Sequence, residues 1–267
     1  MSTSILNAIS LTGVASSLAK AIGVAAPAQA EASIPAIDRL VENNTKNQKV
    51  DRIFMYNPDA IAMWLYQKYT EYYLPLQEHI QLTLPLQTMM PSVTPVCFGT
   101  MYTGALPSVH GIQAYEKPVI KIDTLFDALI RAGKKAAIVS TERDSLSMIF
   151  LEREMDYFIY KTVDECTEKA LELIEEDTYD FILLYNADFD STMHRFGPES
   201  EEALEILQKN IKVFEQIAQK IQKHWGMHET LLGFAPDHGC HEIDGNLGSH
   251  GLDMPEDLNI LHFYTVI

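Results

Sequence analysis

The sequence predicts one α/β domain built on a central, mostly parallel sheet flanked by helices. Short apolar runs alternate with segments of helical periodicity, the pattern of strands joined by helices. The run "YDFILLYN" at 179–186 is apolar enough for a strand covered on both faces. With 267 residues and 47% hydrophobic residues, the chain can form one such domain over 1–267. A small cap or insertion, if present, is expected within about residues 104–175.

The N-terminal thirty residues permit two interpretations. They end in Ala-Gln-Ala, which imitates a signal-peptidase site and would mean secretion. However, the first residues carry no Lys or Arg, and Lys20 interrupts the apolar stretch. Leu11, Val14, Leu18 and Ile22 fall at helical spacing, which favours an amphipathic helix that belongs to the fold.

The remaining elements follow in alternation. Strands are predicted at 52–56, 135–140, 179–186 and 230–236, and helices at 123–133, 164–177 and about 199–223. The last of these helices has an apolar stripe that includes Leu207, Ile211 and Phe214, with acidic residues in its first turn.

Charge and cysteine content exclude several classes of protein. Lys and Arg total 20 against 37 Asp and Glu, so the net charge of −17 would repel a nucleic-acid backbone. No apolar run is long enough to span a membrane. The three cysteines, Cys97, Cys166 and Cys240, are widely spaced and odd in number, which fits a reducing, cytoplasmic compartment. An anionic substrate would need local positive charge, and bound metal ions are the obvious source.

Residues with ligand chemistry follow the predicted strands. Because ligands bind at the carboxyl ends of strands in open α/β sheets, we expect these side chains to gather at one edge. Each alone could be a turn residue or a helix cap. A mixed set of histidines and carboxylates suits Zn²⁺, Mn²⁺ or Fe better than Ca²⁺ or Mg²⁺. The set is Asp59, Asp190, His194, Asp237, His238 and His250.

The hydroxyl-rich stretch "PSVTPVCFGTMYTGALPSVHGI" at 91–112 is harder to interpret. It is too interrupted for an obvious helix and too rich in hydroxyls for an ordinary core strand. Its composition alone favours a long loop with a short buried helix.

Four motifs in this order resemble the alkaline phosphatase superfamily, most closely its type I phosphodiesterase/nucleotide pyrophosphatase branch. They are "SVTPVCFGTMYTGALPSVHGI", "YNADFDSTMHRFGP", "APDHG" and "GSHG". The spacing from Thr94 to Thr103-Gly104 and then to Pro107-Ser-Val-His110-Gly111 is similar to that branch. The resemblance covers roughly residue 50 onwards and implies an alkaline phosphatase-like fold.

The resemblance also implies two divalent metal ions, zinc or alternatively manganese. One would bind Asp190, His194 and His250. The other would bind Asp59, Asp237, His238 and the hydroxyl of Thr94. Thr94 would be the catalytic nucleophile at the start of a helix over 95–103 that Gly104 ends, activated by the metal and by the helix N-terminus. His110 is expected to be structural.

Two positions depart from the family pattern, and two others exclude the sulfatase branch. Cys97 stands at the substrate-binding position, where the branch usually has a phosphate-binding Asn, and a thiol is a poor donor. Asp59 is followed by Ala instead of Gly, so Asn57 remains an alternative first ligand. Phe98 stands where the sulfatase branch has an Arg, and Thr94 where it has Cys or Ser, so that branch is set aside.

The sequence therefore predicts a metal-dependent hydrolase of phosphoric esters, of phosphodiesterase or nucleotide pyrophosphatase type. Its substrate would be a small phosphorylated molecule such as a nucleotide or a phosphodiester. The alternatives are a phosphomonoesterase of the same superfamily, a non-catalytic protein that binds metal and a phosphorylated metabolite, or a purely structural domain. The oligomeric state stays open.

Overall fold

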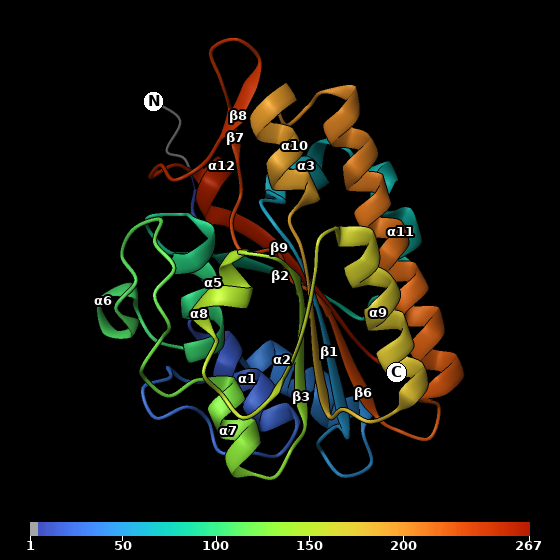
Figure 1. Ribbon diagram of the computed structural model, residues 1–267. Helices are drawn as coiled ribbons and strands as arrows, with labels where there is room; N and C mark the ends of the chain where they lie inside the picture. Colours follow the sequence, from blue (N-terminus) through green and yellow to red (C-terminus); the bar gives the residue numbers. More distant parts are fainter. Residues whose placement is uncertain (1–4) are drawn as a thin grey trace.

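The computed structural model describes residues 5–267 and contains a central seven-stranded sheet (Figure 1). The strand order is β2-β9-β6-β1-β5-β3-β4. Only β9 runs antiparallel to its neighbours, β2 and β6, so the sheet is mostly parallel, as predicted. The strands are β1 (Arg52–Pro58), β2 (Leu82–Gln87), β3 (Ala136–Thr141), β4 (Asp156–Tyr160), β5 (Phe181–Asn186), β6 (Thr230–Phe234) and β9 (Asn259–Val266).

Helices cover both faces of this sheet, and each face has its own apolar cluster. The first face carries α1 (Gly13–Ala21), α2 (Pro35–Asn44), α5 (Thr94–Thr103), α7 (Leu125–Arg131) and α8 (Ser145–Ile149). The second carries α3 (Met63–Lys68), η1 (Thr70–Tyr73), α4 (Leu74–Gln77), α9 (Val163–Glu176), α10 (Asp188–Phe196) and α11 (Glu201–His224). The short elements α6 (Pro107–His110), α12 (Pro255–Leu258) and a hairpin of β7 (His241–Ile243) and β8 (Leu247–Ser249) lie outside the sheet.

Most predicted elements are confirmed, with one correction at the N-terminus. The four predicted strands are β1, β3, β5 and β6, and the long helix is α11 with its apolar stripe buried. The predicted N-terminal helix exists as α1, but it is not amphipathic. Every residue of α1 except Lys20 is buried, because the helix packs against α2, α5 and α7.

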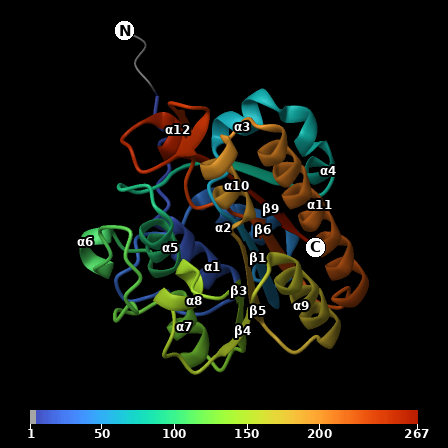
Figure 2. The same cartoon turned by 45° about the horizontal axis from the view of Figure 1, so that its top comes forward.

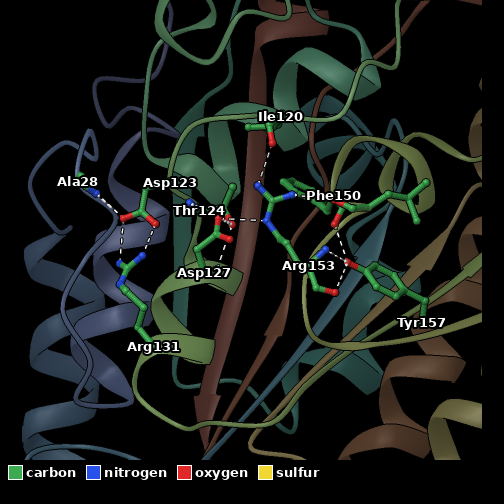
Figure 3. A network of polar contacts seen from close by, with 10 residues as sticks. Ala28, Ile120, Asp123, Thr124, Asp127, Arg131, Phe150, Arg153 and Tyr157 are labelled. Carbon is green, nitrogen blue, oxygen red and sulfur yellow. Dashed lines mark hydrogen bonds and ion pairs between the residues drawn. The ribbon is translucent and has the colours of Figure 1, made fainter.

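The region predicted to hold a small insertion is largely part of the sheet domain. Strands β3 and β4 of this region pair with each other, and β3 pairs with the central strand β5. Polar contacts in Figure 3 also join the segment around Ile120–Asp127 to the segment around Phe150–Tyr157. Arg153 donates to the Asp127 carboxylate and to the carbonyl of Ile120, at 3.0 Å each. A cap could therefore occupy only the part between α5 and α7.

Two expectations from composition can be compared with the structure. Among residues 5–267 no helix is both long and apolar enough to cross a membrane. The three cysteines are free and buried, so they form no disulfide with one another.

Candidate active site

The chemically active side chains gather at the carboxyl ends of three neighbouring strands. Asp59 follows β1, Asp190 lies in the first turn of α10 directly after β5, and Asp237 follows β6. Strands β6, β1 and β5 are adjacent in the sheet, so residues far apart in sequence come together, as predicted. In Figure 2 the helices α5 and α10 lie at this end of the molecule with the α12 segment beside them.

Asp59, Asp237 and His238 form a fully buried group, which we call the inner group. One ligand atom from each lies within 4.8 Å of the others. His238 Nε2 is 3.4 Å from both Asp59 Oδ1 and Asp237 Oδ2. The Thr94 hydroxyl donates to Asp59 Oδ2 at 3.2 Å and lies 3.4 Å from His238 Nε2. The candidate nucleophile thus lies against the inner group.

Asn57, the alternative first ligand, does not join this group. Its side chain accepts a hydrogen bond from Tyr102 and donates one to the carbonyl of Ala235 at 2.7 Å. It is fully buried, and both polar atoms are used by these neighbours. Asp59 is therefore the residue at this strand end that faces the site.

Asp190, His194 and His250 form a second, more accessible group, which we call the outer group. Asp190 Oδ1 is 3.3 Å from the Nε2 atoms of both histidines. The side chain of His194 is 40% exposed, whereas those of the inner group are at most 2% exposed. The rings of His238 and His250 stack with centroids 4.1 Å apart, so the two groups are adjacent.

All three histidines are oriented in the same way. Their Nδ1 atoms lie at 2.8–2.9 Å from backbone carbonyls, those of Gly239 for His238, Gly248 for His194 and Ser92 for His250. Because a carbonyl can only accept, each Nδ1 carries the proton, and a neutral ring then presents its Nε2 lone pair to the carboxylates. This arrangement of a metal-binding imidazole and its carbonyl partner is usual in metalloproteins.

The inner group has no internal way to satisfy its polar atoms. Asp59 Oδ1 and Asp237 Oδ2 are buried and have no hydrogen-bond partner. Burial, followed by the charge of Asp190, raises the pKa of Asp59 to about 7, and burial raises the pKa of Asp237 well above its usual range. Burial also lowers the pKa of His238 to about 3, so this ring stays neutral. The lone pairs of these oxygens and of His238 Nε2 face one another with no hydrogen-bond donor between them, and a divalent cation would satisfy them.

The outer group differs because protons can satisfy it. The Asp190 carboxylate raises the pKa of His194, and it also raises that of His250 although burial opposes this. Burial opposes ionisation of Asp190 as well, but hydrogen bonds from His194 and His250 lower its pKa overall. A cation here would compete with protons on two imidazoles.

Helix α5 places the hydroxyl of Thr94. Thr94 is its first residue, and Gly104 ends it with a positive φ of 71°, so the predicted helix and its stop are confirmed. Every residue of α5 is buried, so packing rather than intrinsic propensity determines the helix. His110 is structural, as expected, since its Nε2 lies 3.1 Å from Thr100 Oγ1 and its ring packs on α5.

Two residues near the inner group were not identified from the sequence. The Tyr185 hydroxyl donates to Asp59 Oδ2, the same oxygen that Thr94 contacts. The backbone N–H of Ala60 donates to Asp237 Oδ1 at 3.3 Å, and Ala60 has a φ of 61°. A glycine at this position would have been the sequence signal for that conformation, and alanine conceals it.

Cys97 does not have the exposure expected of a substrate-binding residue. Its side chain is fully buried in the apolar cluster beneath the first face of the sheet. Its thiol lies 3.8 Å from the carbonyl of Met89, and burial raises its pKa. The sequence prediction placed it by its distance from Thr94, but in α5 that position faces the core, which argues against direct contact with substrate.

Comparison with known proteins supports the predicted relationship. A family model described as type I phosphodiesterase / nucleotide pyrophosphatase matches residues 139–259. This range includes Asp190, His194, Asp237, His238 and His250 but neither Asp59 nor Thr94. No curated protein sequence matches the chain.

Solved structures with the same fold include two groups of enzymes. Human ectonucleotide pyrophosphatase/phosphodiesterase 5 superposes with a TM-score of 0.60 and 17% identity over 72% of this chain and 58% of its own. An inactive variant of the murine enzyme in complex with AMP superposes with a TM-score of 0.59 and 14% identity, over 73% of this chain and 59% of its own. Phosphonoacetate hydrolase from Sinorhizobium meliloti, in complex with phosphonoformate, superposes with a TM-score of 0.51 and 17% identity, over 73% of this chain and 59% of its own. This chain thus spans less than two thirds of the length of these proteins, and their likeness confirms the predicted fold.

Proposed function

We propose that this relative of the type I phosphodiesterases and nucleotide pyrophosphatases is a hydrolase of phosphoric esters that uses two divalent metal ions and Thr94 as its nucleophile. The observation that carries the proposal is the inner group. Two buried carboxylate oxygens without hydrogen-bond partners, Asp59 Oδ1 and Asp237 Oδ2, lie beside His238 Nε2, and the hydroxyl of Thr94 contacts the same group. A structural domain would have no reason to bury carboxylates in this way, because each unsatisfied charge destabilises the fold.

Three protein side chains would coordinate each metal, and the hydroxyl of Thr94 would be a further ligand of the inner metal. Asp59, Asp237 and His238 would hold the inner metal, and Asp190, His194 and His250 the outer one. When bound, such ions supply Lewis-acid stabilisation of the phosphoryl oxygens and lower the pKa of coordinated hydroxyls. The mixture of nitrogen and carboxylate ligands favours zinc, with manganese as the alternative.

The chain's own residues then account for attack and orientation. The Thr94 oxygen attacks phosphorus, the bond to the leaving oxygen breaks, and a phosphothreonine forms that water hydrolyses in the second step. Asp59 Oδ2 accepts the hydrogen bond of the attacking hydroxyl, and the Tyr185 hydroxyl donates to the same oxygen and orients the carboxylate. The N-terminus of α5 supplies a positive dipole end beside the developing charge.

The substrate proposal is a small phosphodiester or nucleotide. It is supported by the family that matches residues 139–259 and by the AMP bound to the murine neighbour. A phosphomonoester is the alternative, since the buried Cys97 offers no donor to the phosphate. Three buried free thiols are compatible with the cytoplasmic location proposed from the sequence.

The test is turnover by protein loaded with Zn²⁺ or Mn²⁺, using p-nitrophenyl phosphate and the p-nitrophenyl ester of phenylphosphonate. We expect metal-dependent release of p-nitrophenol that a chelator abolishes, with the diester preferred. Equal or greater turnover of the monoester would establish the alternative specificity. Metal and nucleotide binding without turnover of either ester would identify a non-catalytic binding protein instead.

A further inference from the structure

We propose that His241 and Asp257 form a positioning pair that keeps His250 of the outer group in register with Asp237 and His238 of the inner group. The inference rests on the proposed function. It concerns residues that neither the sequence motifs nor the two metal groups include.

The segment that carries these three ligands has little support from the sheet. Asp237 and His238 follow β6, and His250 follows the β7–β8 hairpin, whose strands pair only with each other. In Figure 1 this hairpin projects from the molecule beside α10. The hairpin contacts α10, and His250 is hydrogen-bonded to the carbonyl of Ser92, but neither contact joins the chain after the hairpin to the chain before it.

Asp257 supplies a contact of this kind from α12, directly before β9. Its Oδ1 atom accepts a hydrogen bond from His241 Nδ1 at 2.7 Å, and its Oδ2 atom accepts one from the N–H of Leu252 at 2.8 Å. Its own carbonyl accepts the N–H of Gly239 at 2.8 Å. One residue thus ties the chain immediately after His238 to the chain two residues after His250.

The residues that make these hydrogen bonds are buried and closely packed. Asp257 is fully buried and His241 is 9% exposed. A Cβ on Gly239 would lie only 2.0 Å from the carbonyl oxygen of Glu256, so the two backbones are in direct contact. A buried carboxylate that loses one partner remains costly, so the pair should be sensitive to removal of either member.

Loss of the His241–Asp257 pair is expected to affect the outer metal site more than the inner one. Loss of the pair should loosen residues 249–254, which contain His250, without displacing Thr94 or Asp59. Small displacements of a ligand weaken metal binding, and outer partners of ligands typically contribute tenfold or more to affinity. The outer metal should therefore be weakened more than the inner one.

The experiment compares full-length wild-type protein with Asp257→Asn, using Zn²⁺ alone as the probe. Binding is followed calorimetrically, and amide hydrogen exchange is followed in the metal-free protein. We expect an affinity loss of about tenfold for one of two zinc ions and faster exchange in residues 249–254. His241→Gln, which loses Nδ1 but keeps a polar side chain, is the second variant and should act in the same direction if Asp257→Asn does not fold.

The matched control is Asp127→Asn, which removes a carboxylate from the network in Figure 3 that contacts none of the metal groups. It should lower stability without changing either zinc affinity. Equal loss of stability in all three variants with unchanged zinc binding and exchange at 249–254 would overturn the positioning role. Absence of zinc binding by wild type would instead refute the proposed function, and this inference with it.

Discussion

The two ligand groups have similar composition but opposite relations to solvent. The inner group is sealed, and its neutral His238 cannot donate to the two carboxylates that face it. The outer group is partly open, and its histidines can donate to Asp190 once they are protonated. The inner group is thus unfavourable without a cation, whereas the outer group can exist with protons alone. We infer that the inner metal is the more tightly held one and that exchange with solvent occurs mainly at the outer site.

The largest effect is expected at Thr94, which belongs to the inner side of this comparison. Thr94→Ala should lower kcat by three or more orders of magnitude because covalent attack is lost. Thr94→Ser should keep substantial activity, since a primary hydroxyl can attack the same phosphorus. Steady-state kinetics with equal metal loading measures both. Near-normal turnover in Thr94→Ala, with metals retained, would rule out the nucleophile assignment.

Paired asparagine substitutions should separate the two groups by the sign of their effect on stability. Asp237→Asn should lose the inner metal yet raise the free energy of unfolding of the metal-free protein by about 1 kcal/mol, because an amide can donate to His238. Asp190→Asn should lose the outer metal without such a gain, since His194 and His250 can donate to that carboxylate once they are protonated. Metal content and chemical denaturation give both results. The same sign for both variants would remove the distinction between the groups.

An effect of pH on stability is expected at His110, which supports the helix that carries the nucleophile. Burial lowers its pKa from 6.5 to about 4. The folded state therefore binds fewer protons, and stability should fall as pH drops from about 6.5 to about 4. The contribution is about 2 kcal/mol after allowance for solvent screening. His110→Gln should flatten this part of the stability curve of the metal-free protein, and an unchanged slope would show that other groups cause it.

The smallest effect is expected at Ala60, whose positive φ positions an N–H for Asp237. Ala60→Gly relieves strain but loosens the unfolded chain, so stability should change by less than about 1 kcal/mol and metal binding should persist. Ala60→Val should destabilise by more, because a β-branched residue tolerates this conformation poorly. Thermal unfolding of the two variants checks the ranking. Equal destabilisation would mean that the positive φ does not determine which residues this position tolerates.

The sequence predicted those parts of the molecule in which a local pattern and the final environment agree. Strand β5 is apolar throughout because both faces are buried, and α11 keeps a clear stripe because one side faces solvent. Strands β2 and β9 were missed: β2 contains a proline, and β9 has polar residues such as His262 inside an otherwise apolar run. Helix α2 was missed as well, since a proline begins it and only three of its residues are buried.

For the site, the sequence supplied the candidate ligand residues but not the geometry that distinguishes them. Asp59, Asp190 and Asp237 look alike in sequence, and only the structure shows that two are sealed and one can be reached by protonated imidazoles. Cys97 was placed at the substrate-binding position by its spacing from Thr94, and spacing does not reveal that its side chain packs in the apolar cluster. Tyr185 and Asp257 carry no local signal, since their roles depend on partners far away in the chain.

The order of strands in the sheet has a consequence for synthesis of the chain. Strand β2 is made early, but its only partner strand in the described part of the chain is β9, which is made much later. During translation β2 therefore presents unpaired backbone groups, while β1, β5 and β3 can already associate. Its alternating exposure and Pro85 reduce the hazard of pairing with another chain. When β9 is made, it fills the gap between β2 and β6, and Asp257 in α12, directly before β9, secures the His250 segment. The candidate active site is therefore completed late in folding.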